Sequence, residues 1–241
     1  MIAFLTSSPS SAQLPEGPRV PCRLREENGF LDRLSAVWPS QARCLLICAE
    51  PDNGAENDAM GQNLRESLTL SGLSLASLRI CDSRTAASLP GWLAESDVVI
   101  LSGGHTLTQN RFFRRLDLKR LIRGFDGVLL GISGGSMNCA AVVYAQPEWE
   151  GDTKDPGYER FPAGLGLTEL MILPHYQLLK DQRLDGLRLI EDVALPDSAG
   201  RTFYALPDGS YVVLQDGRTE IAGEAYVIRD GSLTRYAGQP V

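Results

Sequence analysis

The chain has 241 residues, of which 43% are hydrophobic and 22% are charged, a composition typical of a globular protein with a sizeable core. Its net charge of −7 and the lack of a block rich in Lys and Arg exclude a general polyanion-binding surface, so no nucleic-acid partner is expected. No run reaches the roughly 18 apolar residues that span a bilayer, and the N-terminus does not resemble a signal peptide. Five cysteines without metal-ligand spacing favour buried thiols in a reducing compartment. We therefore expect a cytoplasmic protein with no membrane partner and no metal site.

The first half of the chain alternates between apolar runs and amphipathic segments. The runs predict strands, and the segments between them show helical spacing of their apolar residues. Strands are predicted at residues 2–5, 43–49, 75–81 and 97–101 and in the run that begins at 127; helices are predicted at 29–38, 57–71, 86–94 and 106–123. This alternation is typical of a parallel sheet with helices on both faces.

The second half has a different pattern. Residues 144–166 are irregular and acidic and predict a surface loop, followed by a strand at 169–173 and a helix at 180–190. Short strands at 203–206, 211–214, 222–228 and 233–236 are separated by the Asp-Gly pairs at 208–209, 216–217 and 230–231. Asp-Gly turns join antiparallel strands, so hairpins are expected at one edge of the sheet. The whole chain, residues 1–241, is predicted to be a single α/β domain.

The stretch from Gly127 to Ala145 gives the first indication of chemistry. A short apolar run is followed by Gly131-Ile132-Ser133-Gly134-Gly135 and then by an apolar stretch of helical length. This pattern matches Gly-x-Ser-x-Gly, the nucleophile elbow, in which a strained turn between a strand and a helix lifts a serine hydroxyl clear of the sheet. Ser133 is therefore the candidate nucleophile.

A serine becomes a nucleophile only when a base accepts its proton, and histidine is the usual base near neutral pH. The chain has two histidines, His105 and His175. His175 follows a predicted strand and lies after the serine in the chain, so it is the preferred base. His105 lies in a glycine-rich turn and is the alternative, although we expect it to line the site instead.

A third residue should orient the histidine, and the acidic loop offers several candidates. They are Glu148, Glu150, Asp152 and Asp155. Glu148 is the nearest to the predicted end of the helix that follows Ser133, so it is preferred, with Glu150 second. The oxyanion needs two N–H donors, for which we expect the backbone of Gly134, directly after the nucleophile, and of Gly104, in the turn after the neighbouring strand.

Four segments together resemble the dipeptidase E family of serine peptidases, to which cyanophycinase is related. They are Ser102–Thr106, Gly131–Gly135 with Asn138, Leu173–Tyr176 and Ala205–Gly209, and the resemblance covers roughly residues 95–230. It implies a class I glutamine amidotransferase-like fold, with Ser133 as nucleophile, His175 as base and an acidic residue between them, where the family's aspartate falls about at Glu148. A glutamine amidotransferase itself would need a cysteine at the elbow.

The resemblance also implies a cofactor-free peptidase that prefers small peptides with an N-terminal aspartate. Lys180 and Arg183 are the nearest counterparts of the basic segment that holds the substrate carboxylate in that family. Two alternatives stay open. One is a non-catalytic ligand-binding or regulatory protein on the same scaffold, because a fold alone does not imply activity. The other is an esterase of the α/β-hydrolase kind, which shares the elbow. The sequence does not indicate an oligomeric state.

Overall fold

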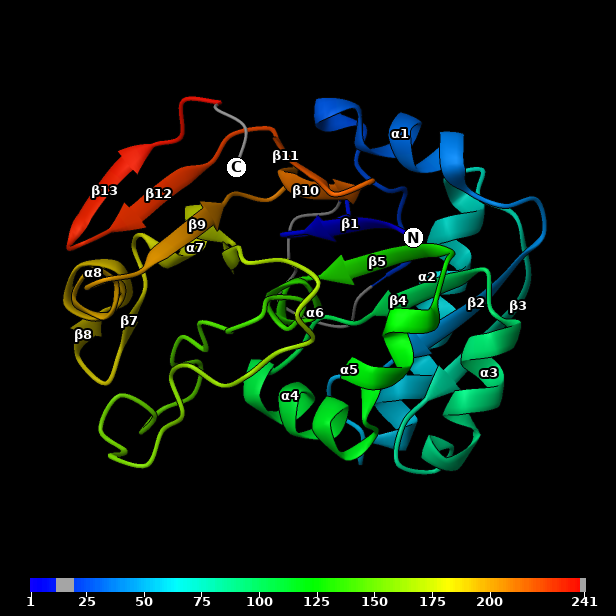
Figure 1. The fold of residues 1–241 in the computed structure, drawn as a ribbon, viewed down its shortest axis with the longest axis horizontal. Coiled ribbons are helices and arrows are strands. Elements are labelled where there is room, and N and C mark those ends of the chain that lie inside the picture. The colour runs from blue at the N-terminus through cyan, green and yellow to red at the C-terminus, as the bar shows by residue number, and fades with distance from the viewer. Residues whose placement is uncertain (12–19, 239–241) are drawn as a thin grey trace.

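The protein is built on a seven-stranded sheet with the strand order β11-β10-β1-β5-β4-β2-β3 (Figure 1). The structure is a computed structural model and describes residues 1–11 and 20–238. Five of these strands, β1 to β5, are parallel, and β10 and β11 are antiparallel additions at one edge. Their bounds are β1 Ile2–Thr6, β2 Ala42–Ile47, β3 Leu75–Cys81, β4 Val98–Leu101, β5 Val128–Ile132, β10 Tyr211–Gln215 and β11 Arg218–Ala222. The predicted α/β class is confirmed.

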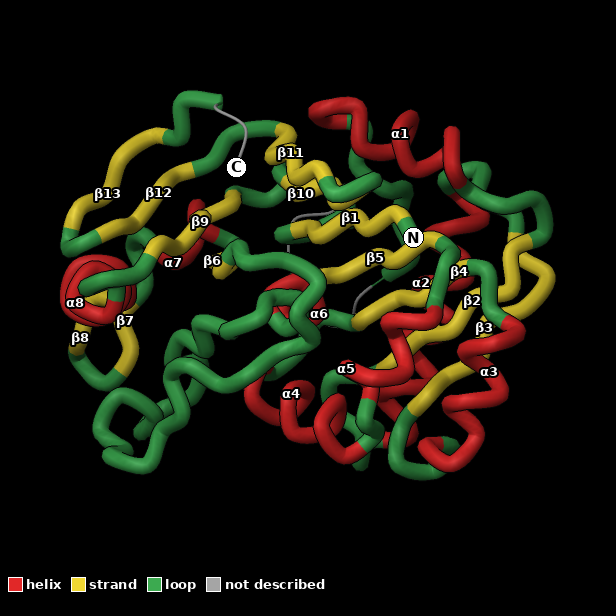
Figure 2. The backbone as a smooth tube through the Cα atoms, viewed as in Figure 1, coloured by secondary structure: helices red, strands yellow, loops and turns green. Residues whose placement is uncertain are grey.

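Helices cover both faces of this sheet (Figure 2). One face packs against α1 (Phe30–Val37) and α2 (Gly54–Leu70), and the other against α3 (Leu89–Glu95), α4 (Thr106–Arg115) and α5 (Leu118–Leu121). Successive strand residues point to opposite faces. In β1, Phe4 belongs to the core between the sheet and α1 and α2, while Ala3 and Leu5 belong to the core on the face covered by α3, α4 and α5. Short 3-10 turns lie at Glu27–Gly29, Ala86–Ser88 and Ile122–Gly124.

Phe4 is expected to be one of the main contributors to the core between the sheet and α1. It is 1% exposed, and its ring contacts the rings of Phe30 and Tyr211 at centroid distances of 6.1 and 6.3 Å. Phe4→Ala should lower the free energy of unfolding by about 3–5 kcal/mol in urea titrations, because it removes these contacts and leaves a cavity. Leu70→Ala, at a side chain that is 53% exposed, is the control and should change it by less than about 0.5 kcal/mol. Equal losses in the two variants would contradict this account of the core.

A second, four-stranded sheet has the order β13-β12-β9-β6. Its strands are β6 Met171–Pro174, β9 Thr202–Leu206, β12 Tyr226–Arg229 and β13 Ser232–Arg235. β6 and β9 are parallel, with Pro174 opposite Leu206, so the residues that follow these two strands emerge side by side. A third apolar core, which includes the stacked rings of Tyr144 and Phe203, packs against this sheet.

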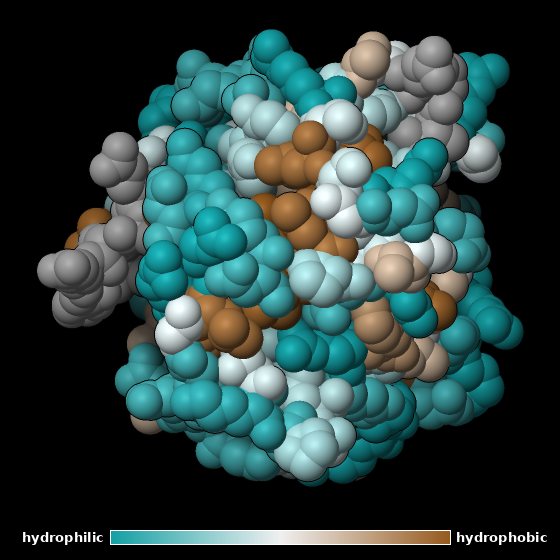
Figure 3. All heavy atoms as spheres, turned by 90° about the vertical axis from the view of Figure 1, so that its left-hand side faces the viewer, coloured by the Kyte–Doolittle hydropathy of each residue, from teal (hydrophilic) through white to brown (hydrophobic). Residues whose placement is uncertain are grey.

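Figure 3 shows the side of the molecule that carries the second sheet, with apolar side chains scattered among polar ones. The elements on this side include β13 and a short hairpin of β7 (Arg183–Leu184) and β8 (Leu187–Arg188). Leu187 and Leu233 are among the large apolar side chains that are exposed in these elements.

The predicted strand at 222–228 is wrong, because this range spans the end of β11 and the start of β12, which lie in different sheets. Three further predictions about local structure are also wrong. Residues 180–190 do not form one helix, because Asp185 and Gly186 adopt positive φ angles of 54° and 90° and turn the chain into the β7–β8 hairpin. A π-helical segment at Leu189–Ala194 and α8 (Leu195–Asp197) follow this hairpin. The pair at 208–209 joins no hairpin, because β9 and β10 belong to different sheets.

The last of these errors concerns the chain after Ser133. The helix there, α6, spans only Gly134–Met137. Beyond Asn138 the backbone becomes extended, and the N–H groups of Ala141 and Val143 donate to the carbonyl oxygens of Thr168 and Pro162. The apolar composition of this stretch therefore reflects burial as extended chain, not as helix.

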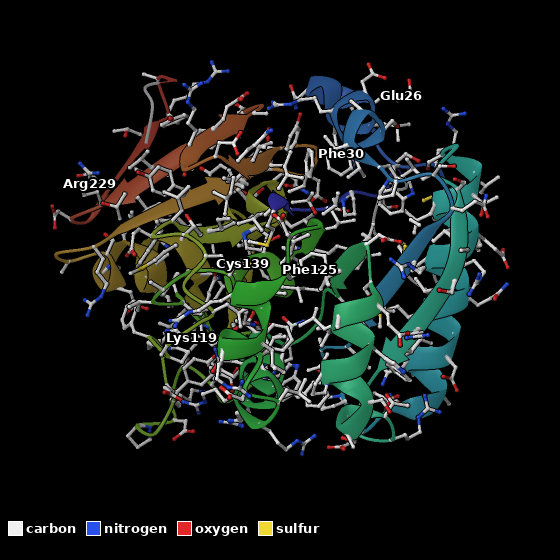
Figure 4. All side chains as sticks on the ribbon, turned by 45° about the vertical axis from the view of Figure 1, so that its right-hand side comes forward. Glu26, Phe30, Lys119, Phe125, Cys139 and Arg229 are labelled. Atoms are coloured by element: carbon white, nitrogen blue, oxygen red, sulfur yellow. The ribbon has the colours of Figure 1, made fainter. Side chains whose placement is uncertain are left out.

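The cysteines that the sequence placed in apolar runs are buried thiols. Cys44, Cys48 and Cys81 lie in or directly after β2 and β3, and burial raises the pKa of each to about 12. Figure 4 shows Cys139 in the interior and Phe30 between α1 and the sheet, whereas Arg229 lies at the periphery. Within residues 1–11 and 20–238, no helix combines the length and the apolar character needed to cross a bilayer.

Candidate active site

Ser133 lies in a strained turn between β5 and α6. Its backbone has φ 48° and ψ −113°, a conformation that residues other than glycine rarely adopt. Its N–H donates to the carbonyl oxygen of Thr6 in the neighbouring β1. Strain of this kind holds the hydroxyl above the carboxyl edge of the sheet, where reactive groups of parallel sheets are found. The turn thus has the geometry of a nucleophile elbow.

His175 meets Ser133 from the second sheet. It follows β6, and its Nε2 atom lies 2.9 Å from Ser133 Oγ. The backbone of His175 is left-handed, with φ 57°, and its N–H donates to Ser7 Oγ at 2.8 Å. The histidine ring is therefore fixed relative to both the serine and the central sheet.

Asp208 holds the other side of the imidazole. Its Oδ1 atom lies 2.7 Å from His175 Nδ1 and accepts a hydrogen bond from Ser7 Oγ, also at 2.7 Å. Burial of the carboxyl group by itself opposes its charge, but the hydrogen bonds from His175 and Ser7 outweigh that effect and lower the pKa of Asp208. A carboxylate in this position fixes the Nδ1–H tautomer and leaves Nε2 free to accept a proton.

The prediction that Glu148 contacts His175 is wrong. Glu148 Oε1 instead accepts a hydrogen bond from the N–H of Thr106, at the first turn of α4, at 3.0 Å. The reason is the extended path after α6, which carries the acidic loop across to α4. Of the other candidates, Glu150 is exposed, Asp152 accepts the N–H groups of Glu148 and Trp149, and Asp155 accepts that of Gly157.

Sequence reasoning missed Asp208 because Asp-Gly pairs usually form hairpin turns. One signal was available, since the pair directly follows Pro207 and a predicted strand, as His175 follows Pro174 and a strand. Two parallel strands that end in this way bring their next residues to a common edge.

The two glycine turns predicted to hold the oxyanion lie against each other. A Cβ atom on Gly134 would come within 2.5 Å of the carbonyl oxygen of Gly104, which has a φ of 146°. Among the hydrogen bonds of the described chain, the N–H groups of Gly104 and Gly134 have no acceptor. These two groups next to Ser133 can therefore serve a ligand oxygen.

A buried amide fixes these turns relative to each other. Asn138 Nδ2 lies 3.1 Å from three acceptors, the carbonyl oxygens of Gly134 and Thr106 and Gln109 Oε1. Asn110 Nδ2 in turn donates to Asn138 Oδ1 at 2.8 Å. This network ties α6 to α4, and with them the two glycine turns.

Replacing Gly134 with alanine should disturb this arrangement. The new Cβ atom would push against the Gly104 backbone, so we expect kcat/KM on a small peptide to fall about 10- to 100-fold, with a loss of about 1–3 kcal/mol in the free energy of unfolding. Gly91→Ala, at a position with no neighbouring atoms around the new Cβ, should leave kcat/KM unchanged. Wild-type kcat/KM in Gly134→Ala would show that the turns tolerate the extra atom.

The residues predicted to bind substrate do not lie together. His105 is the N-cap of α4, where its Nδ1 accepts from the N–H of Thr108, its ring stacks on Trp149 at 3.6 Å and burial lowers its pKa. Lys180 is exposed at the end of α7 (Tyr176–Leu179), and Arg183 is exposed on β7 with Nη1 donating to the carbonyl oxygen of Gly186. No described contact joins Lys180 or Arg183 to Ser133, His175 or Asp208.

Across the described residues, no group of three or more His, Cys, Asp and Glu side chains is placed to hold a metal ion. A shallow cavity of about 650 Å³ lies at the starts of β1, β4 and β5, at the opposite end of these strands from Ser133. Ile2, Asp97 and Val128 are among its lining residues.

Comparison with known proteins gives a family match and a similarity of fold. The model of peptidase family S51 matches residues 49–222, a range that contains Gly104, Ser133, His175 and Asp208. The fold is similar to a solved structure from Listeria monocytogenes EGD-e, described as a candidate peptidase E protein, with a TM-score of 0.55 and 16% identity over 98% of both chains. No curated protein matches the sequence significantly.

Proposed function

The chain belongs to peptidase family S51 and is a serine-type peptidase, and we propose that it cleaves small peptides through an acyl-enzyme on Ser133, with His175 and Asp208 completing the catalytic triad. The observation that carries the proposal is the line of contacts from Ser133 Oγ through His175 to Asp208, at 2.9 and 2.7 Å. This arrangement has the connectivity that acyl transfer by a serine requires.

In the first half of the reaction, His175 Nε2 accepts the proton of the Ser133 hydroxyl as Oγ attacks the peptide carbonyl carbon. The C–N bond then breaks, and the leaving amine takes that proton from His175. In the second half, water attacks the ester, giving its proton to His175 Nε2, and Ser133 is released with the proton returned. Asp208 stabilises the imidazolium in both halves.

The oxyanion that forms in each half-reaction needs preorganised donors. The N–H groups of Gly134 and Gly104 are proposed for this role, and each such donor is worth about 3–4 kcal/mol in measured cases. The proximity of the two turns and the lack of competing acceptors in the described chain support this assignment.

The test of this function is a substrate panel that separates peptides from esters. The panel contains dipeptides, including aspartyl dipeptides, and short p-nitrophenyl acyl esters of matched chain length. Purified protein should hydrolyse the dipeptides with a higher kcat/KM than the esters. Ester hydrolysis alone would favour an esterase. No turnover on either class, together with no reaction of Ser133 with a fluorophosphonate, would contradict the proposal.

A further inference from the structure

The proposed catalytic triad is assembled from two different sheets. Ser133 follows β5 of the seven-stranded sheet, whereas His175 and Asp208 lie just beyond β6 and β9 of the four-stranded sheet. In Figure 1 the arrowheads of β1 and β5 point toward the second sheet. Contacts between the two sheets therefore decide whether the serine hydroxyl and the imidazole meet in the geometry that proton transfer requires.

The end of β1 contacts all three members of the triad through two consecutive residues. The carbonyl oxygen of Thr6 accepts the N–H of Ser133 at 3.0 Å. Ser7, the next residue, accepts the N–H of His175 on its Oγ atom at 2.8 Å. The same hydroxyl donates to Asp208 Oδ1 at 2.7 Å. Ser7 is 0% exposed, so these bonds are shielded from solvent.

The two partners of Ser7 fix the direction of its hydroxyl proton. The backbone N–H of His175 can only donate and an ionised carboxylate can only accept, so the proton of Ser7 must point to Asp208. It is donated to Oδ1, the oxygen that also lies 2.7 Å from His175 Nδ1. One carboxylate oxygen is thus held between a hydroxyl and the imidazole. The bond from Ser7 also contributes to the lowered pKa of Asp208.

Backbone bonds hold the turn around Asp208 against the same residue. The N–H of Ser7 donates to the carbonyl oxygen of Ser210 at 3.2 Å, and the N–H of Ser210 donates to that of Pro207 at 3.0 Å. On another side of the turn, Gln177 Oε1 accepts the N–H of Asp208 at 3.0 Å. These bonds do not involve the Ser7 hydroxyl, so the turn should persist when that hydroxyl is removed.

We propose that Ser7 is a positioning residue of the triad, whose hydroxyl joins the second sheet to the first and aims the carboxylate of Asp208 at His175 Nδ1. Without the hydroxyl, Asp208 Oδ1 keeps its bond to the imidazole but loses the one that fixes its orientation relative to the central sheet. Ser7 acts on the reaction only through this pair. The inference rests on the proposed function and adds a residue to its machinery.

Ser7→Ala tests this role by kinetics on the best dipeptide of the panel. The variant should lower kcat by about 10- to 100-fold, the scale of loss when a reacting group is misplaced by about 1 Å. KM should stay close to that of wild type, because the buried Ser7 side chain does not reach the substrate. An unchanged kcat would overturn the proposal.

Ser71→Ala is the matched control. Ser71 is a buried serine that follows α2, where its Oγ accepts the N–H of Leu24 at 2.8 Å and donates to the carbonyl oxygen of Ser67 at 2.7 Å. The substitution removes the same two kinds of bond shortly before β3 begins, at the opposite ends of the strands from the triad. It should lower thermal stability about as much as Ser7→Ala while leaving kcat unchanged. An equal loss of kcat in both variants would reduce Ser7 to a structural role.

A double-mutant comparison shows whether Ser7 acts through Asp208. In the wild-type background, Ser7→Ala should slow fluorophosphonate labelling of Ser133 at least about tenfold. In the Asp208→Asn background it should slow labelling by less than about threefold, because no carboxylate is left to be aimed. The same factor in both backgrounds would contradict the proposal.

Ser7→Cys provides the test if the alanine variant does not fold. The thiol has a similar shape but is a weak hydrogen-bond donor, so kcat should still fall about tenfold; a wild-type kcat would contradict the proposal. Labelling separates the two levels of the account. Wild-type protein that neither cleaves peptides nor labels at Ser133 would contradict the peptidase function and with it this role of Ser7. Normal labelling of wild type and of the Ser7 variants alike would overturn the role of Ser7 alone.

Discussion

Ser133→Ala is expected to lower kcat on a small peptide by about 10⁶-fold, the scale found when the nucleophile of a serine triad is removed. The hydroxyl makes its hydrogen bond to His175 Nε2, and without it no acyl-enzyme forms. Because the substitution removes a single oxygen atom, circular dichroism and thermal unfolding should be close to wild type. Steady-state kinetics on the best dipeptide of the panel measures the effect.

Ser88→Ala is the matched control for this change. Ser88 is exposed and lies before α3, so its loss should leave kcat unchanged. Turnover within tenfold of wild type in Ser133→Ala, in protein free of contaminating peptidase, would show that another group carries the reaction.

Asp208→Asn should lower kcat by about 10⁴-fold, the second-largest effect. The amide of asparagine would donate a hydrogen bond to His175 Nδ1, which forces the proton onto Nε2. That atom could then no longer accept the serine proton. The loss should be similar for all dipeptides of the substrate panel, because the defect lies in the chemistry and not in recognition of the substrate.

Asp216→Asn is the control for the second prediction. It makes the same change in another Asp-Gly pair, which forms the turn of the β10–β11 hairpin. Its kcat should equal that of wild type. Equal activity of Asp208→Asn and Asp216→Asn would remove Asp208 from the mechanism.

The lowered pKa of Asp208 also predicts a pH dependence of stability. A carboxyl group with a lowered folded-state pKa stabilises the fold at pH values above its unfolded pKa of about 4, and this contribution is lost as the pH falls through the folded-state value. The difference in free energy of unfolding between wild type and Asp208→Asn should therefore shrink on acidification from pH 6 to pH 3. A difference that stays constant over this range would contradict the charged state assigned to Asp208.

The fold was largely predictable because period and burial agree in the central sheet. β1, β2, β4 and β5 are short apolar runs that are mostly buried, and the helices between the strands carry apolar stripes, so tertiary packing and local pattern favour the same structure. The stretch after Ser133 misled the prediction for the opposite reason. Its apolar residues are equally consistent with helix or buried extended chain, and pairing with Thr168 and Pro162 selects the latter.

The elbow and the histidine of the candidate site were found because few residue types suit those roles. The chain has only two histidines, and only one follows a strand after the serine. The acid was harder, since 30 acidic residues compete for it and the contact between His175 and Asp208 joins two strands of a sheet that the sequence did not reveal. Proximity in the chain favoured Glu148, whereas the register of β6 with β9 brings Asp208 to the ring.

The most direct measurement is the site at which a fluorophosphonate reacts with the native protein, determined by proteolysis and mass spectrometry. A single adduct on Ser133 is predicted, with labelling abolished in Ser133→Ala and strongly slowed in Asp208→Asn. An adduct on a different residue, or peptide turnover that continues after Ser133 has been fully labelled, would contradict the account.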